Sequence, residues 1–313
     1  MKTETVTRKF SEQTEAKALA DELRRTIRGE VRFDMGSRAL YATDSSNYRQ
    51  TPIGVVIPRD KEDVINTVHV CRQFGAPILS RGGGTSLCGQ CCNVAVVMDM
   101  SKYFDRLIKI DPVKKLARVE PGIVLDRVRE AANKFGLTFG PDPSTHNHCA
   151  IGGMLGNNSC GVHSVMAAFQ GNGARTSDNT ESIEILTYDG VQMRVGLTSE
   201  EELNAIIRSG GRRGEIYAKL KALRDRYADE IRARYPKIPR RVSGYNLDDL
   251  LPENGFNVAR ALVGSESTLV TILEATLKLI HQPPVRSLLV LGYPDVYSAG
   301  DHVMDALAFT KAS

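Results

Sequence analysis

A run of three glycines between an arginine and two hydroxyl residues, RGGGTS at residues 81–86, constrains this chain more than any other feature. The run follows a short apolar segment, residues 77–79, that is typical of a buried strand. Because glycine has no Cβ, the backbone N–H groups of such a loop can converge on an anion without obstruction. We therefore expect a phosphate-bearing ligand at this loop, with a glycine-rich turn that binds nothing as the alternative.

Two common phosphate loops fit this run poorly. A Rossmann fingerprint needs G-x-G-x-x-G, but Gly82-Gly83-Gly84 is followed by Thr-Ser-Leu and lacks the third glycine. Residues 84–89 have the G-x-x-x-x-G outline of a Walker loop, yet Gln90 stands where that loop needs its lysine. Both differences disfavour a dinucleotide-binding Rossmann domain and a kinase or ATPase.

A second glycine-rich stretch lies at residues 151–161, IGGMLGNNSCG, shortly after the turn sequence PDPS at residues 141–144. Its small residues allow a flat ring to pack directly against the backbone, and Asn157, Asn158 and Ser159 offer donors and acceptors. Two such loops in one chain predict one long cofactor held along its length.

Composition excludes several other classes of protein. The net charge is only +4, without a cluster of five or more Lys/Arg residues, so we expect no nucleic-acid partner. No apolar run approaches the roughly 18 residues of a transmembrane segment. Residues 1–10 lack the apolar core of a secretory signal, which predicts a cytoplasmic protein whose six cysteines are free thiols.

The residue pattern predicts a mixed α and β protein. We expect a helix capped by Ser11 and running to Ile27, since apolar residues recur there at helical spacing before Gly29. The same kind of reading gives further helices and strands along the chain. Helices are expected at residues 60–75, 124–135, 199–208, 215–234 and from 301, and strands at 94–98, 108–110, 117–119, 182–187, 191–195, 259–264, 269–280 and 287–291.

An ordered set of sequence blocks resembles the FAD-binding domain, PCMH type, of the vanillyl-alcohol oxidase superfamily. The similar branch is that of the FAD-linked D-2-hydroxyacid dehydrogenases, which includes D-lactate and D-2-hydroxyglutarate dehydrogenases and the glycolate oxidase D subunit. The resemblance extends over about residues 41–280. In its finer detail the chain resembles large members of this branch, which continue into an iron-sulfur region. The blocks are residues 81–89, 120–122, 141–144, 151–161, 178–179, 243–247 and 262–266.

This resemblance implies an α+β fold with two lobes, a small α/β lobe and a larger mixed or antiparallel sheet lobe flanked by helices. It implies a helical lead-in at residues 1–48 and an FAD-binding domain at 49–285, with the small lobe at about 49–120 and the larger lobe at about 121–285. Residues 286–313 would begin a truncated substrate or cap domain.

The implied activity is oxidation of a small D-2-hydroxy acid of the D-lactate or D-2-hydroxyglutarate type to the 2-oxo acid. Electrons would pass to FAD and then to an acceptor that the sequence does not identify, either in the cytoplasm or at the inner membrane. Two alternatives remain: a flavin electron-transfer subunit without a substrate site, and an NADPH-dependent flavin reductase of the same fold. Homo-oligomerisation is left open.

The resemblance also implies how the cofactor is held. Relatives with covalently attached flavin carry His where Thr85 stands, so FAD should be bound non-covalently here. An iron-sulfur cluster, and the catalytic base, would need sequence beyond Ser313. The implied cofactor-binding residues are Arg81, Gly82, Gly83, Gly84, Thr85 and Ser86 at the diphosphate, Gly89 and Gln90 on the same wall, Pro141, Asp142, Gly152, Gly153, Asn157, Ser159, Gly161 and His163 near the flavin and its ribityl chain, Ile183 on the adenine side, and Glu266 beside the flavin.

Several residues have a second interpretation. Arg241 and Tyr245 are candidates for binding a substrate carboxylate, but a solvated arginine pair explains Arg240-Arg241 equally well. His163 and Glu266 can equally be structural. Cys88-x-x-Cys91-Cys92 has no second Cys or His pair at ligand spacing, so we expect no metal there. Ser267 stands where the family pattern has glycine, which leaves the geometry of that turn open.

Overall fold

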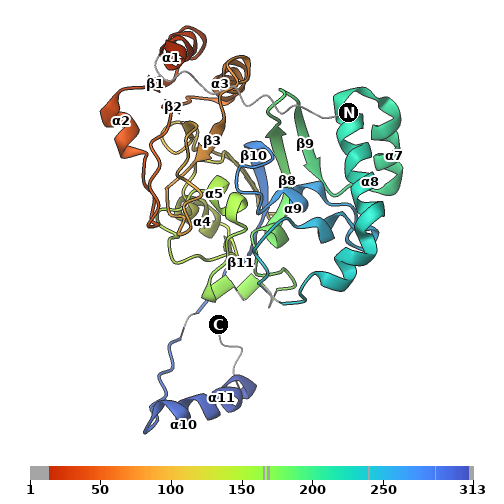
Figure 1. Ribbon diagram of the computed structural model, residues 1–313. Coiled ribbons are helices and arrows are strands. Elements are labelled where there is room, and N and C mark those ends of the chain that lie inside the picture. Colours follow the sequence, from red (N-terminus) through yellow and green to blue (C-terminus); the bar gives the residue numbers. More distant parts are fainter. Residues whose placement is uncertain (1–13, 165, 168–169, 239, 286, 310–313) are drawn as a thin grey trace.

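The computed structural model describes residues 14–164, 166–167, 170–238, 240–285 and 287–309. Two sheets and a two-stranded ribbon form the body, helices flank them, and a C-terminal segment projects away from it (Figure 1). The predicted mixture of helices and strands is therefore present.

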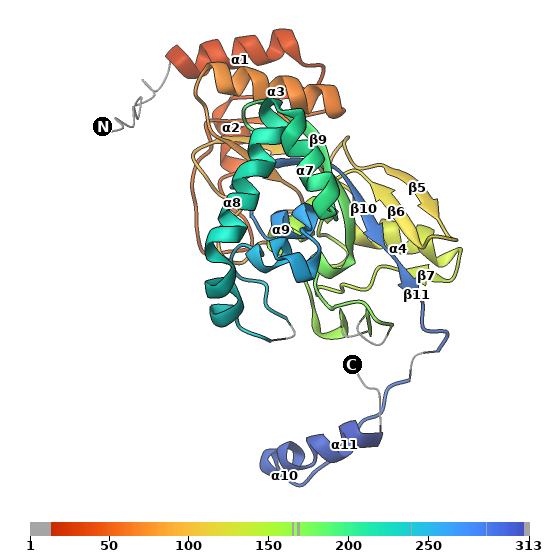
Figure 2. The ribbon, with the colours of Figure 1, turned by 90° about the vertical axis from the view of Figure 1, so that its right-hand side faces the viewer.

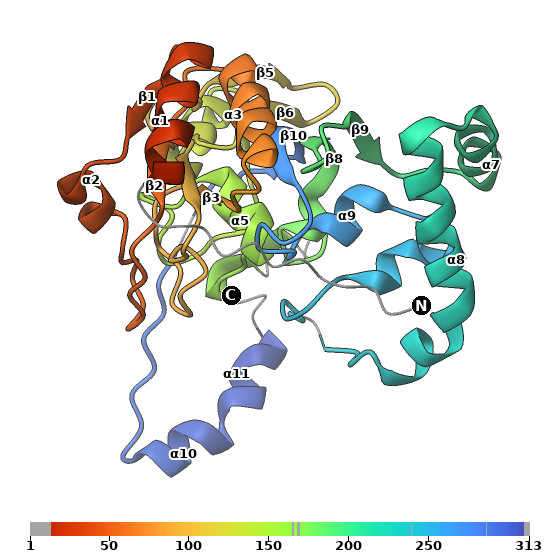
Figure 3. The ribbon, with the colours of Figure 1, turned by 45° about the horizontal axis from the view of Figure 1, so that its top comes forward.

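A four-stranded sheet carries the first glycine loop. Its order is β1 (Glu30–Arg32), β2 (Gly54–Ile57), β4 (Val96–Asp99) and β3 (Ile78–Arg81). Strands β2 and β3 run parallel to β4, whereas β1 is antiparallel to β2. The helices α1 (Thr14–Thr26) and α3 (Lys61–Gln73) lie together over this sheet (Figure 3), and α2 (Met35–Leu40) follows β1. Asp60 caps α3 by accepting a hydrogen bond from the Asp63 N–H, as its position before the apolar pattern predicts.

A five-stranded antiparallel sheet forms the larger part of the body (Figure 2). Its order is β5 (Leu107–Asp111), β6 (Leu116–Val119), β10 (Thr271–Lys278), β8 (Thr180–Leu186) and β9 (Gln192–Gly196). Strand β10 therefore lies at the centre although it comes from late in the chain. A short ribbon pairs β7 (Leu137–Thr138) with β11 (Ile280–His281).

Helices connect and cover these sheets. The long helix α8 (Gly211–Arg234) packs beside α7 (Glu200–Ser209), which begins with a capping box formed by Ser199 and Glu202. The remaining elements are α4 (Leu125–Asn133), α5 (Ile151–Asn157), α9 (Val258–Leu262), α10 (Val296–Asp301) and α11 (Val303–Phe309), with single turns at Val162–Ser164, Ser177–Asn179, Leu247–Leu250 and Pro252–Asn254.

The two sheets share part of their hydrophobic core. Leu186 of β8 and Leu273 of β10 pack among the side chains that line the four-stranded sheet, such as Val96. An ion pair between Lys61 Nζ on α3 and Glu184 on β8, at 2.9 Å, joins the same units at the surface. The glycine loop at the end of β3 is thus held against the five-stranded sheet.

Some elements differ from the sequence-based expectations. Residues 259–264 were expected to form a strand, but the chain forms helix α9 because Asn257 accepts the Arg260 N–H and caps a helical turn. Residues 287–291 form no strand, and Leu288 is 90% exposed, because no neighbouring strand is available to them in the described part of the chain. The cap proposed at Ser11 lies outside the described residues.

The division into lobes stays a prediction, and the sheet topology bears on where its borders would lie. Strands β5 and β6 were assigned to the small lobe, but β6 pairs with β10 and β5 pairs with β6, so both belong to the five-stranded sheet. Strand β1, assigned to the lead-in, pairs with β2. In both cases the sheet to which a strand belongs is determined by pairing with a strand that is distant in the sequence, and the local residue pattern does not indicate such pairing.

Candidate cofactor site

One pocket brings together the first glycine loop, helix α5 and the turn before β10. It opens at the C-terminal end of the parallel strands β3 and β4, where α/β sheets commonly bind ligands. Its lining residues are Ser80, Arg81, Gly82, Ser86, Gln90, Cys91, Met100, Pro121, Gly152, Gly153, Gly156, Asn157, Ser265, Glu266, Ser267, Val270 and Ile272.

The Arg81 side chain organises the first loop. Its guanidinium donates to the main-chain carbonyls of Thr43 at 2.9 Å, Cys91 at 3.1 Å and Tyr41 at 3.3 Å, and lies over the Tyr41 ring. The Tyr41 hydroxyl in turn donates to Asp99 at 2.6 Å, and burial together with this carboxylate raises the pKa of Tyr41. Most donors of the guanidinium are therefore used within the protein, so an anion at this loop would meet mainly backbone N–H groups.

Two glycines of the run allow the two loops to touch. A Cβ at Gly82 would lie 2.6 Å from the Cβ of Ala150, and a Cβ at Gly83 would lie 2.3 Å from the carbonyl oxygen of His148. Both distances are too short for any side chain. The first loop therefore packs backbone to backbone against the entry to α5.

Helix α5 forms a wall of bare backbone. The Gly152 N–H donates to the Pro121 carbonyl at 2.7 Å, and a Cβ at Gly152 would lie 2.8 Å from the Pro121 Cβ. Gly153, in contrast, has no atom within 4 Å of a built Cβ, and Gly156 has only the Glu266 Cα at 4.0 Å. Gly152 thus serves packing within the protein, whereas Gly153 and Gly156 leave the pocket side of the helix open.

Hydrogen bonds cross-link the three walls. Ser86 Oγ accepts from Asn157 Nδ2 at 3.3 Å, which joins the first loop to α5. Gln90 Nε2 donates to Glu266 Oε1 at 3.2 Å, which joins the same loop to the turn before β10. The pocket is consequently bordered by uncharged polar groups, the Glu266 carboxylate and the Arg81 guanidinium.

The turn before β10 contains two consecutive left-handed residues, Glu266 with φ 50° and Ser267 with φ 62°. This backbone region favours glycine, and a residue with a side chain pays roughly 1–2 kcal/mol to adopt it. Ser267 therefore adopts a conformation that favours glycine, at a cost in conformational energy. The side chain of Glu266 is directed to Gln90 as a result.

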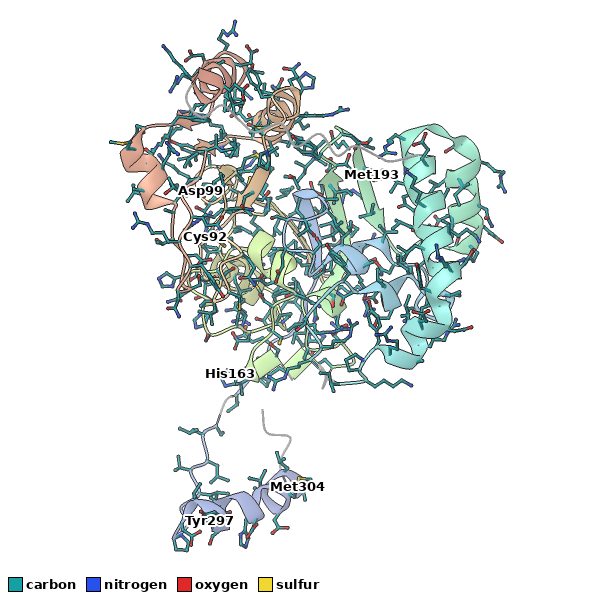
Figure 4. The ribbon with its side chains drawn as sticks, viewed as in Figure 1. Cys92, Asp99, His163, Met193, Tyr297 and Met304 are labelled. Carbon is teal, nitrogen blue, oxygen red and sulfur yellow. The ribbon has the colours of Figure 1, made fainter. Side chains whose placement is uncertain are left out.

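Other predicted residues gather in a separate cluster after α5. Arg129 donates to Asp142 at 2.6 Å, and the exposed ring of His163 lies 3.2 Å from the same carboxylate. Ser164 Oγ accepts from the N–H groups of Asp142 and Gly161. Figure 4 shows His163 at the edge of the body from which the C-terminal segment leaves. This cluster fixes the segments on either side of α5 to each other.

The structure thus brings together part of the predicted cofactor set. Arg81, Gly82, Ser86, Gln90, Gly152, Gly153, Asn157 and Glu266 line the pocket. Ile183 is fully buried in the hydrophobic core on β8, between β9 and β10, so its side chain is not available to a ligand. The remaining predicted residues that do not line the pocket are Gly83, Gly84, Thr85, Gly89, Pro141, Asp142, Ser159, Gly161 and His163.

Arg241 and Tyr245 line a different hollow, a groove beside the C-terminal half of α8. Arg241 is 7% exposed, donates to both carboxylate oxygens of Asp248 at 2.6 and 2.7 Å, and lies over the Tyr235 ring. The Tyr245 hydroxyl lies 2.8 Å from Thr268 Oγ1, at the turn that borders the cofactor pocket. The groove and the pocket therefore adjoin the same turn.

The sequence reasoning missed several lining residues. Pro121 and Ser265 belong to blocks that carried the family resemblance, so a signal for them was present. Cys91 and Ser267 were noted for other reasons. Met100, Val270 and Ile272 are apolar residues at strand ends, and nothing in their local sequence separates them from core positions.

A mostly buried ion-pair cluster lies outside the set of residues that line the pocket. Asp178 binds Arg175 and Arg260, each at 2.8–2.9 Å, and Asp249 lies 3.0 Å from Arg260. Burial raises the pKa of Asp249 to about 6, although Arg260 opposes this change, and Asp249 Oδ2 accepts no hydrogen bond. Ionised Asp249 is therefore incompletely compensated.

Two of the sequence predictions concern membrane-spanning segments and metal sites. Within residues 14–309, apart from the gaps given above, no helix is both long enough and apolar enough to span a membrane. In the same part of the chain no three His, Cys, Asp or Glu side chains are grouped so as to hold a metal ion.

Known proteins with similar sequences include D-2-hydroxyglutarate dehydrogenases and glycolate oxidase subunits. The chain is 29% identical over 280 residues to D-2-hydroxyglutarate dehydrogenase of Pseudomonas putida, covering 87% of this chain and 27% of that protein. It is 30% identical to the Escherichia coli K12 enzyme of the same name, over 87% and 26% of the two chains. Glycolate oxidase subunit GlcD of Bacillus subtilis is 27% identical, over 90% and 49%. The chain thus spans about a quarter to a half of the length of these curated relatives.

A solved structure of alkyldihydroxyacetonephosphate synthase superposes with a TM-score of 0.59 at 17% identity, covering 86% of this chain and 44% of that one. This similarity confirms the predicted fold over most of the chain. Residues 52–196 match the family model described as FAD binding domain, and they contain both glycine loops. These residues therefore match the FAD binding domain that the resemblance predicted.

Proposed function

We propose that this chain is the FAD-holding part of a flavoprotein dehydrogenase that oxidises a D-2-hydroxy acid, of the D-lactate or D-2-hydroxyglutarate type, to the 2-oxo acid. The observation that supports the proposal most is the single pocket in which both glycine loops and the turn at residues 265–267 meet. The D-2-hydroxyglutarate dehydrogenases and GlcD subunits that resemble 84–90% of the chain indicate the substrate class.

The residues of the pocket fit FAD. Gly153 and Gly156 present open backbone against which a flat or extended group can lie, and Ser86, Gln90 and Asn157 supply hydrogen-bonding groups beside it. In this proposal residues 82–86 hold the diphosphate through main-chain N–H groups. The bound flavin would accept two electrons from the α-carbon of the substrate.

Arg81, Gln90 and Glu266 are assigned supporting tasks. Arg81 holds residues 41–43 and 91 around the loop, so that its N–H groups are already oriented before the cofactor arrives. The bond between Gln90 and Glu266 closes one side of the pocket and limits the access of water. These tasks position the cofactor and involve no proton transfer.

For the substrate carboxylate we assign Arg240 in preference to Arg241. Arg241 is paired with Asp248, and breaking that nearly buried pair would be costly. Arg240 is exposed on the groove, and its Nη1 donates to the Gly161 carbonyl at 3.3 Å, beside the second loop. An exposed guanidinium at that place can pair with a carboxylate at little cost.

The C-terminal segment fits the proposed start of a substrate domain. Its apolar side chains are exposed, including Leu288 at 90% and Val290 at 79%, which suits a segment that packs against further protein. Figure 4 shows Tyr297 and Met304 on the helices of this segment, away from the body.

Anaerobic reduction of the bound flavin tests the proposal. The full natural protein containing these residues is loaded with FAD and mixed with D-lactate or D-2-hydroxyglutarate, with the L-enantiomers as controls. We expect a D-acid, and not its L-enantiomer, to bleach the absorption band of oxidised flavin. Reduction by dithionite but by no 2-hydroxy acid would reject the dehydrogenase and leave the electron-transfer subunit.

A further inference from the structure

Two cysteines lie in the turn that follows the glycine run, separated only by Gly89 and Gln90. Cys88 is exposed, whereas Cys91 is partly buried and lines the cofactor pocket. Gly89 has φ 80°, and the Cys92 N–H donates to the Gly89 carbonyl at 3.0 Å, so a turn begins directly after Cys88. A C-x-x-C segment is a common arrangement of thiols that are oxidised and reduced as a pair.

The other thiols are much less suited to such chemistry. Burial raises the pKa of Cys71 to about 12, and burial likewise raises the pKa of Cys149 and Cys160. Cys92, next to the pair, is 7% exposed, and burial followed by the nearby Asp44 carboxylate raises its pKa too. Because the thiolate is the reactive form, oxidation should begin elsewhere than at these four residues.

Both members of the pair are connected to groups of the pocket. The Cys88 N–H donates to Gln90 Oε1 at 3.2 Å, and the same amide donates to Glu266 across the pocket. Cys91 Sγ donates to Ser86 Oγ at 3.4 Å, and Ser86 also accepts from Asn157. A change in the relative position of the two sulfurs would therefore shift hydrogen bonds on all three walls.

We propose that Cys88 and Cys91 form a redox pair that peroxide oxidises reversibly to a disulfide, and that this disulfide weakens FAD binding. The inference rests on the proposed assignment of the cofactor to this pocket. To reach Cys88, Cys91 Sγ must leave Ser86, and a disulfide sulfur has no hydrogen left to donate. The turn also tightens around Gln90, which holds the bridge to Glu266.

The oxidation proceeds in two balanced steps. The Cys88 thiolate attacks one oxygen of hydrogen peroxide, the O–O bond breaks, and a sulfenic acid and hydroxide form. Cys91 sulfur then displaces the hydroxyl group of the sulfenic acid, so that the S–S bond forms, the S–O bond breaks and water leaves. Overall two thiols and one peroxide give one disulfide and two waters, and a dithiol reductant reverses the change.

The test measures disulfide formation and FAD affinity independently. FAD-free protein is oxidised with hydrogen peroxide, digested and mapped by mass spectrometry, and FAD is titrated into the reduced and oxidised forms. We expect an 88–91 disulfide and an affinity about tenfold lower, the effect of losing about one hydrogen bond. Dithiothreitol should restore the original affinity.

Matched serine variants separate this mechanism from general oxidation. Cys88→Ser lies outside the pocket wall and should bind FAD normally but lose the response to peroxide, whereas Cys160→Ser should respond like the wild type. A peroxide response that persists in Cys88→Ser, or an 88–91 disulfide that leaves the affinity unchanged, would overturn the inference. Failure of the reduced protein to bind FAD would instead count against the assigned cofactor site.

Discussion

The neighbouring glycines of helix α5 should respond in opposite ways to the same added methyl group. Gly153→Ala places a Cβ where no atom lies within 4 Å, on the pocket side of the helix. Gly152→Ala places it 2.8 Å from the Pro121 Cβ and 3.0 Å from the Pro121 carbonyl oxygen. The two residues share a helix, so the surroundings of the methyl group account for most of the difference between them.

The expected magnitudes follow from these distances. Alanine is favoured over glycine inside a helix by roughly 0.5–1 kcal/mol, so Gly153→Ala should raise the free energy of unfolding of the FAD-free protein by up to that amount. At Gly152 the same gain is outweighed by overpacking against Pro121, which costs roughly 1–3 kcal/mol. We expect net destabilisation of about 0.5–2 kcal/mol for Gly152→Ala.

The FAD affinity should show the complementary pattern. In Gly153→Ala the methyl group occupies space assigned to the cofactor, and an overpacking cost of roughly 1–3 kcal/mol corresponds to a dissociation constant about five- to 150-fold higher. Gly300→Ala is a control in helix α10, which projects away from the body (Figure 1) and where a Cβ also meets no atom within 4 Å. It should bind FAD like the wild type.

Urea unfolding of the FAD-free proteins and fluorescence titration with FAD measure the two quantities separately. A Gly153→Ala protein that is stabilised and binds FAD as tightly as the wild type would show that the cofactor does not lie against this face of α5. A Gly153→Ala protein as destabilised as Gly152→Ala would show that the space beside Gly153 is filled, and would refute the reasoning altogether.

Three further outcomes are expected. Ser267→Gly should raise the free energy of unfolding by about 0.5–1 kcal/mol. It relieves the left-handed strain at φ 62°, and the greater entropy of glycine in the unfolded chain offsets part of this gain. Ser267→Ala keeps the Cβ and should give no such gain in the same urea measurement. Because the pKa of Asp249 is raised to about 6, the folded protein loses stability as pH rises from about 4 to 6, and the full loss is present above pH 6. The free energy of unfolding of Asp249→Asn relative to that of the wild type should therefore increase over this interval. A difference between the two proteins that does not change with pH would contradict the assignment. FAD should be released when the protein is denatured in acid, because Thr85 cannot form the histidyl bond of covalent relatives, and flavin remaining on the precipitated chain would disprove this.

Local residue patterns predicted most individual elements because caps and periodicity act over short distances. Asp60 and Ser199 cap helices where the sequence indicates, and the turn at residues 189–190 joins two paired strands. The pattern gave a wrong prediction at residues 259–264, because an apolar run fits a buried helix as well as a strand. The chain forms a helix there because Asn257 caps it. It also failed to assign β5 and β6 to a sheet, since β6 joins that sheet through β10, which lies more than 150 residues away along the chain.

The site was predictable to the extent that it is made of backbone. Gly153 and Asn157 were found because glycine and polar residues concentrate where a ligand approaches the main chain. The different surroundings of Gly152 and Gly153 were not predictable, because only the fold places Pro121 next to Gly152. Nor does the sequence indicate that Ile183 faces the core, since a buried strand carries apolar residues on both faces.

The structure changes the reason for the glycine run itself. The sequence suggests that Gly82 and Gly83 are glycines because an anion must reach the backbone, yet any side chain at either position would first collide with residues 148–150. The close approach of the two loops is what makes one cofactor able to touch both of them. Since Arg81 also binds the carbonyls of residues 41, 43 and 91, the loop conformation is fixed by the protein before any ligand binds. Less conformational entropy is then lost when the cofactor binds, so the loop conformation that forms on folding raises the affinity for the cofactor.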